Sequence, residues 1–397
     1  MKHLHHAIWA AVAAGAFYVG SSSSPDHQAS SGNSRDSSAP STLPLSGRTN
    51  PSPENGARHS SENPLSSRNH DIASLLGSTH LSDEDIALLG EEFRTAKGPI
   101  ARRLAFSELL KGMTPENAKL MREQIDHLPQ DSPEFREFHY AWGALAGQEA
   151  VLNGADTPKR DMAATLAGWA SADPDNALAY FNSLTPEVQN GGNHMKWGAV
   201  FGLADANPDL AAEFATVRHA NGDKDAGKMI HITAGAILQN GNLETAKEWA
   251  QNVPGGPLKG EATSKVAEEI SKNNPKEALS WAQTLAEGDS KNRAIGSTFS
   301  NWAGQDPEAA AHQISSLSGA EKDAATYGYA TRVVHDDPAV GIEWASTISD
   351  ENARNSALLN TGRTFFEKNP EAAAAWLPQS GLSPELQQKI SPSKRAF

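Results

Sequence analysis

An Asp-Pro or Asn-Pro dipeptide recurs at nearly constant distance along the last three-quarters of the chain. It divides the chain into units, each with one anchor residue, which is the proline wherever the dipeptide is present. The intervals between successive anchors are 32, 27, 34, 35, 32, 32, 31 and 32 residues, and the anchors are Pro115, Gly147, Pro174, Pro208, Leu243, Pro275, Pro307, Pro338 and Pro370. Repeats of this length typically form helix pairs that can bury their apolar faces only against neighbouring pairs.

The residue before the anchor predicts where helices begin. It is an Asp or Asn in each of the last seven units: Asp173, Asn207, Asn242, Asn274, Asp306, Asp337 and Asn369. An Asp or Asn side chain accepts a backbone N–H that the first helical turn leaves unpaired, and proline is favoured at the first helical position. Since proline also disfavours continuation of the preceding helix, each dipeptide should end a first helix and start a second one.

Three further positions recur with similar residues in the last seven units. A small residue follows the anchor by three positions: Ala177, Ala211, Ala246, Ala278, Ala310, Gly341 and Ala373. Three residues later an aromatic stands in six of seven units: Tyr180, Phe214, Trp249, Trp281, Gln313, Trp344 and Trp376. Five residues before the anchor the side chain is bulky and apolar: Trp169, Leu203, Leu238, Ile270, Trp302, Val333 and Phe365. Spacing of three places the small and aromatic residues on one helix face, so these positions should form the core.

We therefore expect an all-α fold, a right-handed α-solenoid of helix-turn-helix repeats with a period of about 32 residues. Residues 99–380 should form the repeat domain, residues 71–98 its N-terminal capping helices, and residues 381–397 a C-terminal cap and tail. The unit at Gly147 is degenerate, since its second helix is cut short at Asn153 and Gly154. Ser82 and Ser383 should each cap a helix outside the regular units.

The first 70 residues predict an export signal followed by a spacer. An apolar run over residues 7–20 has the length of a signal-peptide hydrophobic region and is short for a membrane span, so residues 1–20 should be a cleaved signal peptide or an uncleaved anchor. Residues 21–70 contain 16 Ser and 6 Pro but no Phe, Trp or Tyr, which predicts a disordered linker. We expect the protein to be exported to the periplasm or cell envelope, with residues 7–20 as the only candidate membrane tether.

Composition and motifs exclude several classes of chemistry. A net charge of −14 disfavours nucleic acid and anionic membrane surfaces, and the lack of cysteine excludes thiol chemistry and Cys-ligated metals. The stretch from Gly222 to Lys228 imitates a phosphate-binding loop, but Met229 stands where Ser or Thr is needed. The same stretch has the alternating acids of a calcium loop without its glycine and closing glutamate, so we interpret it as a polar turn. We expect no catalytic residue, metal or cofactor.

The segment from Gly241 to Trp249 resembles the start of the second helix of a tetratricopeptide repeat, with its small residue, alanine and aromatic. The recurrent Trp-Ala-x-x-Asp-Pro-x-x-Ala of residues 169–177 and 302–310 is similar to exported bacterial repeat proteins of unknown function. The apolar positions of the first helix are one residue out of the tetratricopeptide phase. This resemblance implies a concave groove that binds a peptide or partner protein.

Two functional hypotheses follow. The first is an exported scaffold that binds a protein or peptide partner through the concave face, with polar or aromatic contact residues on first helices: Lys196, Trp197, His231, Arg332 and Arg363. The alternative is an extracytoplasmic enzyme of the helical-toroid type, a lyase or glycan-active enzyme with a site assembled across repeats. That alternative requires a cluster of His, Tyr, Arg or carboxylate side chains that converges across units. A deep pocket in which Tyr327, Tyr329, Arg332 and His335 converge would favour it.

Overall fold

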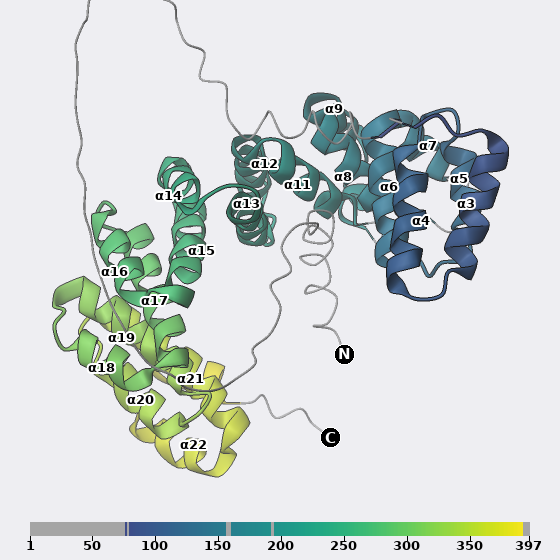
Figure 1. Ribbon diagram of the computed structural model, residues 1–397. Helices are drawn as coiled ribbons and strands as arrows, with labels where there is room; N and C mark the ends of the chain where they lie inside the picture. The colour runs from purple at the N-terminus through teal and green to yellow at the C-terminus, as the bar shows by residue number, and fades with distance from the viewer. Residues whose placement is uncertain (1–75, 78, 156–159, 192–193, 392–397) are drawn as a thin grey trace, which may run out of the picture. The chain divides into compact units, whose positions relative to one another are not determined.

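The computed structural model describes residues 76–77, 79–155, 160–191 and 194–391 (Figure 1). These residues form helices and connecting turns, with no strand among them. The expected export segment and linker, residues 1–70, lie outside the described residues, as do residues 71–75 and 392–397. The prediction of an all-α fold is confirmed for the part of the chain described.

Helices alternate between first and second members of each pair. The first helices are α4 (Pro99–Lys111), α6 (Pro133–Ala146), α8 (Met162–Ala172), α11 (Met195–Ala206), α13 (Ala226–Asn240), α15 (Pro257–Asn273), α17 (Asp289–Gln305), α19 (Gly319–Val333) and α21 (Glu351–Lys368). The second helices are α5 (Ala118–Gln124), α7 (Gln148–Ala155), α9 (Pro174–Ser183), α12 (Pro208–Ala220), α14 (Leu243–Asn252), α16 (Pro275–Thr284), α18 (Pro307–Ile314), α20 (Pro338–Ser346) and α22 (Pro370–Trp376). The remaining helices of the described residues are α3 (Asp83–Thr95), α10 (Pro186–Asn190), the short 3-10 helix η1 (Leu377–Gln379) and α23 (Pro384–Ile390).

The seven predicted caps are confirmed. Each Asp or Asn accepts a hydrogen bond from a backbone N–H two or three residues ahead, at 2.8–3.3 Å between nitrogen and oxygen. Ser82 makes a reciprocal capping box with Asp85, and Ser383 caps α23. The unit at Pro115 departs from the pattern, because a turn over residues 115–117 precedes α5.

The repeated small and apolar positions form the core. The small residue is buried in all seven units, with an exposed fraction of at most 1% for each alanine. The bulky residue before the anchor is buried in six units, and Leu238 is half-buried beside the buried Ile237. The aromatic position is less covered, since only Phe214, Trp249 and Trp281 are fully buried. Packing between units therefore depends most on the small residues and the first helices.

Helices pack consecutively along the chain. From α6 to α21 each first helix contacts the next first helix, and each second helix from α9 to α20 contacts the first helix of its own unit and of the following one. Helices α3 to α6 contribute an apolar core of their own, which includes Phe93, Phe106 and Phe135. A second, larger core runs from Val151 to Val333.

Glycines bring several first helices into backbone contact. A methyl group added to Gly168 of α8 would lie 1.8 Å from the Tyr140 carbonyl oxygen of α6. The same addition to Gly328 of α19 would lie 1.9 Å from the Gly296 carbonyl oxygen of α17. Because these obstacles are backbone atoms, only glycine fits at such positions, and close approach permits Cα–H···O contacts between helices.

Candidate binding surface

The first helices expose side chains at spacings of three and four residues, which places them on one face of each helix. We call this set the first-helix face. Its members are half-buried or exposed: Trp197, Phe201, His231, Gly235, Glu261, Ser264, Glu268, Arg293, Ser297, Ser300, Tyr327, Thr331, Asn360 and Arg363. It carries Trp197 and Phe201 on α11, His231 on α13, two glutamates on α15, and mainly uncharged polar side chains from α17 to α21.

Ionic contacts across units fix part of this face. The Nε2 atom of His231 lies 2.8 Å from a carboxylate oxygen of Glu261, whose other oxygen lies 2.7 Å from Arg293. Arg293 also contacts Asp289 one turn earlier, at 2.8 Å. The close contact with His231 and the positive charge of Arg293 lower the pKa of Glu261 despite its partial burial. Three successive first helices, α13, α15 and α17, are thus linked through their side chains.

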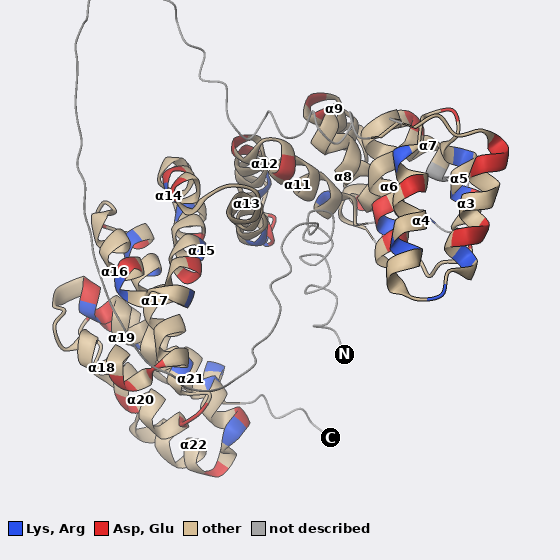
Figure 2. Cartoon of the chain, in the orientation of Figure 1, with Lys and Arg blue, Asp and Glu red and all other residues tan. Residues whose placement is uncertain are grey.

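A second contact continues the same face toward the C-terminus. The amide nitrogen of Asn360 on α21 lies 2.5 Å from the hydroxyl oxygen of Tyr327 on α19. Figure 2 shows that Lys and Arg are interspersed with Asp and Glu along the described helices rather than segregated on separate ones. The face offers hydrogen-bonding groups in fixed positions and carries both signs of charge.

Of the five predicted contact residues, Trp197, His231 and Arg363 lie on the first-helix face. Trp197 is half-buried against the main core, and His231 is held by Glu261. Arg363 is exposed, and its Nε donates to the carbonyl oxygen of Lys389 near the end of α23 at 3.2 Å. Arg363 therefore also holds the last helix against α21.

Lys196 lies elsewhere, in a buried ion-pair cluster. Its exposed fraction is 8%, and its Nζ lies 3.2 Å from Asp223 and 2.9 Å from Asp225. Arg218 approaches Asp223 to 2.7 Å. Hydrogen bonds from Lys228 and then Lys196 lower the pKa of Asp225. Lys196 therefore points inward, away from the surface where we expected it, because it pairs with Asp223 and Asp225.

Replacing Lys196 with methionine should lower the free energy of unfolding by about 2 kcal/mol, because the change leaves Asp223 and Asp225 partly buried without this partner. The control is Lys228→Met, which removes a lysine with a 63% exposed side chain from the same Asp225. Lys228→Met should change the free energy of unfolding by no more than about 0.5 kcal/mol. Urea denaturation of both variants measures the difference, and equal effects would contradict the structural role given to Lys196.

The four residues of the enzymatic alternative do not share a site. Tyr327 contacts Asn360, whereas Tyr329 is buried with its ring centroid 4.7 Å from that of Trp344. Nη1 of Arg332 donates to a carboxylate oxygen of Asp336, just beyond the C-terminal end of α19, at 2.6 Å. His335 is exposed. These four side chains do not converge, because Tyr327 and Tyr329 have different surroundings on α19.

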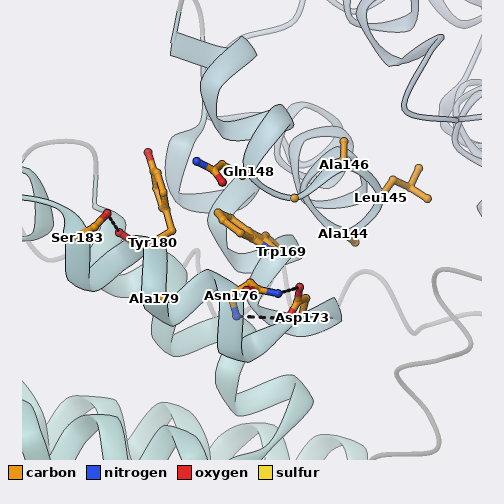
Figure 3. Close-up of a pocket in the computed structure, with 11 residues that line it drawn as sticks. Ala144, Leu145, Ala146, Gln148, Trp169, Asp173, Asn176, Ala179, Tyr180 and Ser183 are labelled. Atoms are coloured by element: carbon orange, nitrogen blue, oxygen red, sulfur yellow. Dashed lines mark hydrogen bonds between the residues drawn. The ribbon is translucent and has the colours of Figure 1, made fainter.

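A groove lies where the unit at Gly147 meets the unit at Pro174 (Figure 3). It has a volume of about 570 Å³ and is bounded by the end of α6, the start of α7, and helices α8 and α9. Trp169 and Tyr180 form its aromatic walls, with ring centroids 5.3 Å apart and planes inclined by 43°. Gln148, Asp173, Asn176 and Ser183 supply polar groups. We call this the Trp169–Tyr180 groove.

The repeat positions of Trp169 and Tyr180 predict core residues and do not predict a groove between these two units. Trp169 is indeed buried, but Tyr180 is half-buried. Two signals mark the location. The interval from Gly147 to Pro174 is the shortest of all, and Asn153 occupies the position where six of the last seven units have an aromatic residue.

A buried polar contact also joins α6, α11 and α13. The Tyr140 hydroxyl donates to one carboxylate oxygen of Asp205 at 2.9 Å, and the Asn240 amide donates to the other at 3.0 Å. Burial raises the pKa of Asp205 and that of Tyr140. Nothing in the local sequence predicts this contact, because Tyr140 and Asp205 belong to units that are not adjacent in the chain.

Within the described ranges, no helix combines the length and apolar character needed to cross a bilayer, and no group of three or more His, Asp or Glu side chains is placed to hold a metal ion. The chain matches no protein-family model, no curated protein and no solved structure.

Proposed function

We propose that the helix pairs stack as a right-handed α-solenoid of tetratricopeptide-like repeats that acts as an exported scaffold. In this proposal the first-helix face binds a protein or peptide partner, and residues 1–20 direct the chain out of the cytoplasm. The linker over residues 21–70 separates this signal from the repeat domain.

One observation carries the proposal: polar side chains of successive first helices contact each other across units and thereby hold one another in place. The linked sets are His231–Glu261–Arg293 and Tyr327–Asn360. A surface whose side chains are already ordered loses less conformational entropy on binding. Neutral, small Ser297 and Ser300 on α17 leave room between these sets for a partner's main chain to approach.

The test is to block this surface without disturbing the core. Ser300 is half-buried on the first-helix face, whereas Ser280 is exposed on α16, a second helix. Ser300→Arg should reduce capture of an envelope partner at least tenfold, because the long side chain occupies the space between α15 and α19. Ser280→Arg introduces the same residue on a second helix and should leave capture unchanged.

Capture is measured by quantitative mass spectrometry after crosslinking in an envelope fraction, with circular dichroism as the folding control. Equal loss of capture in both variants, or unchanged capture in both, would contradict the first-helix face as the binding surface.

A further inference from the structure

We infer that the Trp169–Tyr180 groove receives the arginine side chain of a basic partner peptide. The inference goes beyond the proposed function, because the groove shares no residue with the first-helix face. It depends on the charge of the groove, on its aromatic residues and on the space left beside them by Gly147.

Charge favours a cation. Of the eleven residues that line the groove, Asp173 is the one with a full charge, and no Lys or Arg is among them. Its carboxylate caps α9 through the Asn176 backbone N–H at 3.3 Å and accepts the Asn176 side-chain amide at 2.7 Å. Each carboxylate oxygen can accept a second hydrogen bond, so Asp173 keeps acceptor capacity toward the groove.

The aromatic walls favour a planar cation with an apolar stem. Both aromatic residues line the groove, Tyr180 as a half-buried side chain and Trp169 with an exposed fraction of 6%. The π face of an aromatic ring attracts guanidinium and ammonium groups electrostatically. Guanidinium stacks on aromatic rings and pairs with carboxylates in two-point geometry, which a lysine ammonium cannot do. An aromatic pair beside a carboxylate, with no competing protein cation in the lining, therefore matches arginine.

Access to the rings depends on a glycine. Gly147 ends α6 with a φ of 53°, a conformation that favours glycine. A methyl group at this position would lie 3.2 Å from Nε1 of the Trp169 indole. Glycine at this position avoids that contact with the indole of Trp169, which Figure 3 shows near Gln148.

The repeat supplies a matched pair of variants. Four of the seven capping positions are Asn, so Asp173→Asn removes the charge while keeping a cap that this fold uses elsewhere. Asp306 caps α18 in the same way and stands outside the groove, so Asp306→Asn is the control.

The test is an NMR titration of the full chain, in which the tryptophans are ¹⁵N-labelled. The added ligand is the peptide acetyl-Gly-Arg-Gly-amide, at low salt. The neutral analogue with citrulline in place of arginine is titrated in parallel, and the Trp169 indole resonance is assigned with Trp169→Phe. The arginine peptide should shift this resonance, and citrulline should not. Asp173→Asn should weaken binding about fivefold, as expected for one partly exposed ion pair, whereas Asp306→Asn should not.

Equal shifts with citrulline, or unchanged affinity in Asp173→Asn, would overturn the inference. These outcomes are distinct from failure of the proposed function. If the arginine peptide does not bind but Ser300→Arg still abolishes partner capture, the results support the proposed function and contradict the cation site. If the peptide binds at Trp169 but Ser300→Arg has no effect on capture, the results support the cation site and contradict binding through the first-helix face.

Discussion

Replacing Gly328 with alanine is expected to lower the free energy of unfolding by about 3 kcal/mol. The added methyl group would lie 1.9 Å from the Gly296 carbonyl oxygen of the neighbouring first helix. No side-chain rotation can relieve a clash with backbone, so α17 and α19 must separate and lose their close packing. Urea denaturation followed by circular dichroism measures the change.

Gly235→Ala is the matched control and should act in the opposite direction. Gly235 also lies inside a first helix, but an added methyl group would meet no atom within 4 Å. Alanine costs less conformational entropy than glycine in a helix, so this variant should be more stable by about 0.5–1 kcal/mol. Destabilisation of both variants, or of neither, would contradict the close approach of α17 and α19.

Lowering the pH from 7 to 4 is expected to remove about 3 kcal/mol of stability through His139 alone. His139 is 1% exposed, and its Nδ1 lies 2.7 Å from the Phe135 carbonyl oxygen. The rings of Phe135, Phe138 and Trp142 surround it. Burial, together with the positive charge of Arg122, lowers the pKa of His139 to about 4, although the Phe135 carbonyl partly offsets this.

The sign follows from proton uptake. In the unfolded chain a histidine binds a proton near pH 6.5, whereas in the folded chain His139 remains neutral down to about pH 4. Its contribution to stability is therefore complete above pH 6.5 and is lost as the pH falls to 4. Glu137 and Asp161 have pKa values raised mainly by burial, so their contributions have the opposite pH dependence.

His139→Leu separates these effects, because it removes the histidine and leaves both carboxyl groups. The stability of the variant should fall less between pH 7 and pH 4 than that of the natural chain, by about 3 kcal/mol. The measurement is urea denaturation at several pH values. Parallel pH profiles for the two proteins would show that His139 is not buried in its neutral form.

Much of the fold could be predicted because the signals are local and repeated. An Asp or Asn followed by proline acts on the first turn of its own helix, and the cap at Asp173 forms as its sequence predicts. The small residue at Ala177 and its equivalents is buried for the same reason in each unit.

The candidate site was less predictable, because it depends on contacts between units. Periodicity places Lys196 next to Trp197 on a first helix, but it does not reveal that Asp223 and Asp225 of the following turn draw the lysine inward. Likewise Tyr140 reaches Asp205 across α8, where Gly168 permits a close approach. Such contacts are set by the distance between helices, which no single unit encodes.

Photocrosslinking from the first-helix face tests partner binding most directly. A photoreactive phenylalanine analogue is placed at Ser300 in one full-length protein and at Ser280 in another, and both are irradiated in intact cells. We expect one defined polypeptide adduct from position 300, which disappears when Ser297→Arg is added, and no such adduct from position 280. Adducts of the same identity and yield from both positions, or from position 280 alone, would contradict binding through the first-helix face.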